Sequence, residues 1–60
     1  MNWAHYYRAA MVARDRSQWD RMERFLAAAE RSLGSIRDED ELGLVRAYVW
    51  AARAQLLVVG

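Results

Sequence analysis

The feature that most constrains the fold is a long apolar stretch near the end of the chain, from Leu42 to Val59. One set of residues within it recurs at alternating spacings of three and four, which places the set on one face of a helix. The set comprises Leu42, Val45, Val49, Ala52, Leu56 and Val59. Because other apolar residues, such as Trp50 and Leu57, lie on further sides, we predict a helix over residues 38–58 that is apolar nearly all round. Such a helix is normally surrounded by neighbours.

The preceding segments also have helical patterns, with good helix formers throughout and no proline. In the middle segment one face carries Trp19, Met22, Leu26, Ala29 and Leu33, which predicts a helix over 17–33. Ser17 and Asp20 resemble a loose capping box at its start, and Gly34 is a natural residue to end it.

The first segment has its own apolar face, formed by Ala4, Tyr7 and Met11, and predicts a helix over 3–14. If this helix continued into the next, Arg14 or Asp15 would fall on the buried face. We therefore expect a break near residues 15–17, with one continuous helix from Trp3 to Leu33 as the alternative.

A single all-α domain over residues 1–60 follows from these patterns, either a helical hairpin or a small three-helix bundle with the third helix at its centre. A chain of this length buries only about 60% of the surface that its unfolded form exposes. It has no cysteine and one histidine, so disulfides and thiolate metal sites are excluded. We therefore expect association, most simply as a homodimer, to complete the bundle.

The residues expected at a partner or self interface are those that two short helices would leave uncovered. In the third helix they are Trp50, Leu56, Leu57 and Val58. Near the N-terminus Trp3, Tyr6 and Tyr7 cannot all face one way on a helix, so at least one is expected to dock outside the fold, with Trp3 and Tyr6 as candidates. Tryptophan and tyrosine are enriched at interaction hot spots.

No catalytic, cofactor or metal signature is present in the sequence. Residues 38–41 are four consecutive acids, and their position suits the positive end of a helix dipole better than a metal site. The expected function is therefore that of a non-enzymatic interaction protein: an adaptor, an accessory subunit or an inhibitor that occupies a site on a larger protein complex. An obligate structural subunit is an alternative.

Nucleic-acid binding is the rival from another class, through Arg14, Arg21, Arg24 and Arg31. The net charge is only +1, and acidic residues lie among these arginines, so the basic surface typical of such proteins is lacking. We regard nucleic acid as an unfavoured partner.

A membrane span is not expected, because Arg46 and Arg53 interrupt the apolar stretch and each costs about 2.5–3.5 kcal/mol at a helix centre. The first residues also lack the pattern of a signal peptide. We therefore expect a cytoplasmic protein. All nine basic residues are arginine, which favours a GC-rich source, bacterial or phage.

Overall fold

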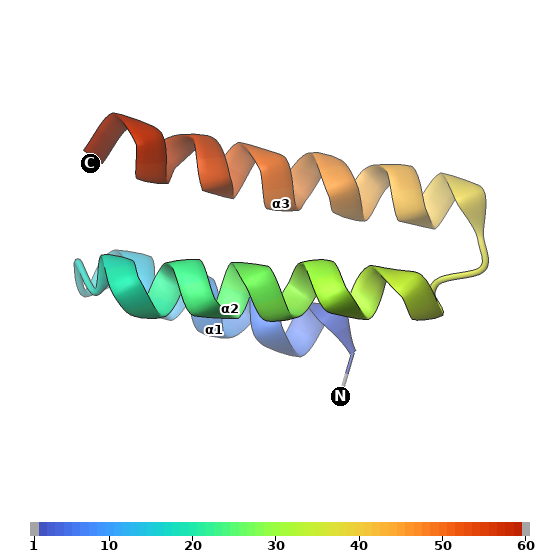
Figure 1. Cartoon of the computed structure of the whole chain (residues 1–60), viewed down its shortest axis with the longest axis horizontal. Helices are drawn as coiled ribbons and strands as arrows, with labels where there is room; N and C mark the ends of the chain where they lie inside the picture. Colours follow the sequence, from blue (N-terminus) through green and yellow to red (C-terminus); the bar gives the residue numbers. More distant parts are fainter. Residues whose placement is uncertain (1, 60) are drawn as a thin grey trace.

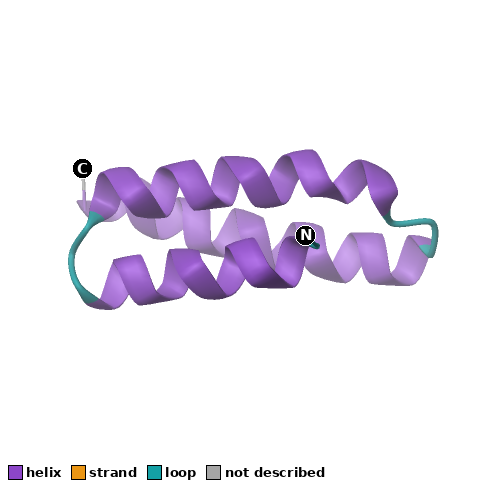
Figure 2. Cartoon of the chain, turned by 90° about the horizontal axis from the view of Figure 1, so that it is seen from below, coloured by secondary structure: helices purple, strands orange, loops and turns teal. Residues whose placement is uncertain are grey.

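A computed structural model describes residues 2–59 and shows three helices. Helix α1 spans Trp3–Asp15, α2 spans Trp19–Ser32 and α3 spans Glu39–Val59, with a short 3-10 turn, η1, at Leu33–Ser35. Successive helices run in opposite directions and form a compact bundle (Figures 1 and 2). The all-α, three-helix prediction is confirmed, with helix ends within two residues of those expected.

A sharp turn separates α1 from α2, so the predicted break is confirmed and the single long helix is wrong. Ser17 has a φ of 57°, in the left-handed region that a right-handed helix does not use. Helix α2 then begins at Trp19 with Gln18 in the capping position and no side-chain capping bond. The capping box predicted from Ser17 is therefore absent, because Ser17 is used to reverse the chain.

The connection from α2 to α3 also differs from the sequence-based expectation at its first residues. Among residues 2–59 no glycine has a positive φ, so Gly34 does not end α2 in the left-handed conformation; α2 tightens into η1 instead. The acidic run behaves as expected. The Oδ1 atom of Asp38 accepts hydrogen bonds from the backbone N–H groups of Asp40, at 2.9 Å, and Glu41, at 3.4 Å, and so caps α3.

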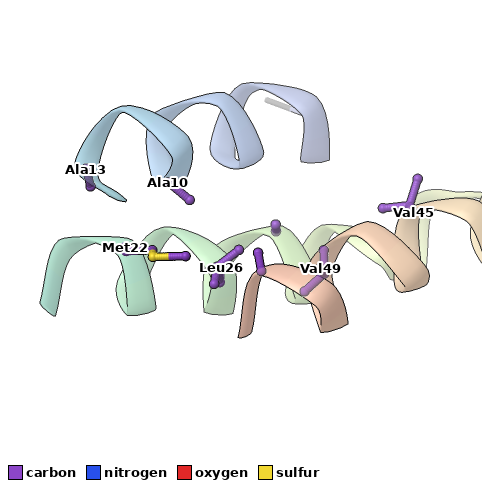
Figure 3. Packing of buried hydrophobic residues seen from close by; sticks show 8 residues of the cluster. Ala10, Ala13, Met22, Leu26, Val45 and Val49 are labelled. Atoms are coloured by element: carbon purple, nitrogen blue, oxygen red, sulfur yellow. The ribbon is translucent and has the colours of Figure 1, made fainter. Parts of the chain in front are cut away.

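The buried core is drawn from all three helices (Figure 3) and comprises Ala10, Ala13, Met22, Leu26, Ala29, Val45, Val49 and Ala52. The small α1 residues in this set let α1 lie close to α2. Helix α2 packs against both α1 and α3, whereas α3 buries a single face. The expectation that the third helix lies at the centre is therefore wrong: α3 forms one side of the bundle.

Candidate interaction surface

Helix α3 carries an apolar surface on the side that faces away from the core, here called the outer face. It consists of eight exposed residues: Gly43, Leu44, Ala47, Trp50, Ala51, Ala54, Leu57 and Val58. Its large side chains are extensively exposed, with 63% of Trp50, 81% of Leu57 and 88% of Val58 accessible. A continuous apolar surface of this kind on a small protein usually marks a site of interaction.

The outer face exists because α3 has two apolar faces and the fold covers one of them. Val45, Val49 and Ala52 point inward and are buried. Trp50, Ala54 and Leu57 follow a second series with the same alternation of three and four residues. Since α1 and α2 both lie on the inward side, this second series has no neighbour within the described chain (Figure 1).

Polar contacts bound the outer face on the side of α2. Arg53 forms an ion pair with Glu30 of α2, with 3.1 Å between its Nη2 and the carboxylate Oε2. The Nε atom of Arg53 is buried without a hydrogen-bond partner. Arg46, one heptad earlier, is exposed and has no ion pair among the described residues. This edge therefore carries two guanidinium groups and one carboxylate.

Aromatic rings bound the outer face on the side of α1. Tyr48 of α3 stacks on Trp3 at a centroid distance of 6.4 Å and lies 5.8 Å from the ring of Tyr7. Farther along, Nη1 of Arg14 donates a hydrogen bond of 3.4 Å to Oε1 of Gln55. These contacts hold α1 along α3 between Tyr48 and Gln55.

The predicted interface residues separate into two groups. Trp50, Leu57 and Val58 lie on the outer face, as expected. Leu56, Trp3 and Tyr6 are partly buried and pack against the core, and Tyr7 does the same. The N-terminal aromatic residues therefore pack in part against the core, and the expectation that one of them docks outside the fold stays a prediction.

Sequence reasoning also missed members of the outer face that are small. Gly43 and Ala47 are absent from the sequence-based prediction, although Ala47 lies one heptad before Ala54, which shares a line with Trp50 and Leu57. The spacing places these residues beside Trp50, but glycine and alanine contribute little apolar area, so hydrophobicity alone does not mark them as part of an interface.

The arginines considered for nucleic-acid binding do not form one surface. Arg21, Arg24 and Arg31 are exposed on α2, with Asp20 beside them. Arg14 is partly buried at the edge of α3, where it bonds Gln55 and Asp15. A different basic feature lies in the groove between α1 and α2. It is lined by Arg8, Arg16 and Arg21 together with apolar residues such as Val12 and Phe25.

Metal binding and membrane insertion are the other roles to compare with a protein interface. Among residues 2–59 no three histidine, cysteine or carboxylate side chains are grouped so that they could hold a metal ion. By length and composition α3 could cross a membrane, and only 17% of its most apolar stretch is buried in the fold.

Comparisons with protein-family models, with curated proteins and with solved structures give no match.

Proposed function

We propose that this protein is a non-catalytic interaction protein that acts by binding another protein surface through the outer face of α3. The observation that carries the proposal is the exposure of Trp50, Leu57 and Val58 on a helix whose opposite side forms the core. Burying that face against a protein removes apolar area from water at about 25 cal/mol per Å², which favours association.

The composition of the face supports a protein partner. An aromatic residue at the centre of an apolar patch, with charged residues kept to its rim, is the usual anatomy of a protein interface. Trp50 lies midway along the outer face, and Arg46 and Arg53 lie at its edge. The role would be that of an adaptor, accessory subunit or inhibitor, because such roles need a binding surface and no reactive group.

Site-specific photo-crosslinking tests the proposal in cells that express the protein. Leu57 is replaced by a benzophenone-bearing amino acid, and the adducts are identified by mass spectrometry. We expect protein adducts from position 57, and we expect them to disappear when Trp50→Asp is added, because a carboxylate at the centre of the face opposes its burial.

The matched control places the same crosslinker at Arg24, an exposed position on the outer side of α2. Protein adducts at position 57 that exceed those at position 24 would support the proposal. Equal and low yields at the two positions would overturn it, since the outer face would then have no protein bound to it.

Nucleic-acid binding is a second candidate, favoured by the groove between α1 and α2. Arg8, Arg16 and Arg21 line this groove, and none of the three forms an ion pair among residues 2–59. Binding of this kind weakens steeply with salt because phosphate contacts release counterions. A gel shift that is lost in the double variant Arg16→Glu, Arg21→Glu would support it, and no shift with the unmodified chain at low salt would end it.

A further inference from the structure

We infer that the partner of the outer face is a second copy of this chain, bound with its α3 antiparallel and with the two-fold axis between Trp50 and Ala51. The inference rests on the proposed function, since it names the partner of the same surface. It is drawn from how the sizes and charges along α3 match when the helix is paired with its own reverse.

The sizes of the side chains complement one another in this register. Each residue lies at the level of the one equally far beyond the axis, and Ala47 and Ala54, which lie on the middle line of the outer face, meet each other. Trp50 lies on the α2 side of this line, so the two Trp50 side chains lie next to each other at the edge of the interface beside α2. The Ala47–Ala54 contacts let the two backbones approach closely, and the larger side chains of the outer face pack on either side of them. Close packing at its centre is what a stable interface requires.

The charges select the antiparallel orientation. Asp40 lies one heptad before Ala47, at the acidic end of the line that runs along the middle of the outer face. In a parallel pair Asp40 would meet Asp40 of the second copy. Two facing carboxylates repel each other. In the antiparallel pair Asp40 lies past the last turn of the other α3, where water reaches it.

The edge beside α2 is also complementary in the antiparallel pair. A two-fold axis perpendicular to the helices brings the α2 sides of both copies together. Arg46 then lies about 3 Å along the axis from the level of Arg53 in the second copy, given a rise of about 1.5 Å per residue. Within the second copy, Arg53 holds the carboxylate of Glu30 at 3.1 Å. That carboxylate is therefore within the reach of Arg46 of the first copy. Each Glu30 would bridge two guanidinium groups across the interface.

Cysteine crosslinking tests both the partner and the orientation, because the chain contains no cysteine of its own. Two single variants are made, Ala47→Cys and Ala54→Cys, and each is oxidised alone and mixed with the other. In the antiparallel register positions 47 and 54 face each other, whereas the two copies of position 47 are about 10 Å apart along the axis. A disulfide needs Cα atoms within about 7 Å.

We expect the mixture to give a disulfide-linked heterodimer of the two variants, and we expect little linkage in either variant alone. Arg24→Cys, on the outer side of α2, is the control for random collision. Efficient linkage in each single variant would show a parallel pair and overturn the proposed register. Linkage no greater than that of the control, together with a monomer in sedimentation equilibrium of the unmodified chain, would overturn self-association.

A second pair of substitutions separates a fitted interface from a merely apolar one. Ala47→Leu with Ala54→Leu makes the outer face more apolar but fills the points of closest approach. We expect self-association to weaken at least about tenfold, with the helical circular dichroism signal of the folded chain retained because leucine is a good helix former. Tighter association in the double variant would overturn the fitted register.

The other possible occupants give distinct results. Adducts at position 57 with a different protein only, from a chain that sediments as a monomer, would leave the proposed function standing and overturn the second copy. Co-flotation of the unmodified chain with phosphatidylcholine vesicles, without protein adducts, would overturn both, because the outer face would then bind lipid.

Discussion

Ser17 shows how one residue fixes the topology. Its left-handed backbone reverses the chain between α1 and α2, in a turn where the N–H of Gln18 donates to the carbonyl of Ala13 at 2.8 Å. This conformation costs a residue with a Cβ atom about 1–2 kcal/mol, whereas glycine adopts it without that cost. The greater freedom of glycine in the unfolded chain offsets part of that gain.

We therefore expect Ser17→Gly to raise the free energy of unfolding by about 0.5–1 kcal/mol in urea titrations. The control is Ser35→Gly, at a position without a positive φ whose hydroxyl donates a 2.8 Å hydrogen bond to the carbonyl of Ser32. This variant should lose stability. A loss of stability for both variants would contradict the role assigned to Ser17.

Leu26 is a large residue at the centre of the core, fully buried on the helix that contacts both others. Replacing it with alanine removes three carbon atoms and leaves a cavity, which costs about 2–5 kcal/mol. A domain of this length has a total stability of about 3–9 kcal/mol. We expect Leu26→Ala to lower the free energy of unfolding by about 2–5 kcal/mol in urea titrations, a large share of that total, while Leu44→Ala on the outer face lowers it less. Equal losses in the two variants would place the core elsewhere.

At the scale of the elements, α3 depends on its first turn. Its acidic start supplies both a cap, from Asp38, and negative charge at the positive end of the helix dipole. We expect Asp38→Ala to lower the free energy of unfolding by about 1 kcal/mol. Asp15→Ala is a suitable control, because Asp15 is the last residue of α1 and its exposed carboxylate pairs with Arg14 instead of capping a helix N-terminus. Equal effects of the two substitutions would contradict the cap.

The positions of the helices could be predicted from the sequence, because apolar spacing and helix formers act locally. The three helices are found where the pattern placed them. The end signals were less reliable: Ser17 and Gly34 fit capping motifs but have other conformations, since capping depends on the path of the next segment. The arrangement of helices was also misjudged, because composition does not reveal that α3 packs with one face only.

The candidate site was predicted in part for a similar reason. Trp50, Leu57 and Val58 could be identified from the excess of apolar residues in the last helix, and they are exposed. Leu56 and Trp3 could not be separated from them, because their burial depends on how α1 and α2 approach α3. Which of two apolar faces turns inward is a tertiary choice.

At the scale of the whole molecule, stability and association are coupled. Sixty residues leave one apolar face of α3 in water, so the isolated bundle has a small core for its surface. A partner that binds only the folded state stabilises it by mass action. If the partner is a second copy, the thermal midpoint must depend on the protein concentration itself.

We therefore expect the midpoint of the unmodified chain, followed by circular dichroism, to rise by about 10 °C over a hundredfold increase in concentration. The shift follows because two chains share one unfolding step, and concentration favours the paired state. Trp50→Asp should have a lower midpoint that is independent of concentration, since its outer face no longer pairs. Arg24→Asp, which changes charge on the outer side of α2, should behave like the unmodified chain. A constant midpoint in the unmodified chain would mean that the monomer is the stable unit and that the outer face serves a different protein.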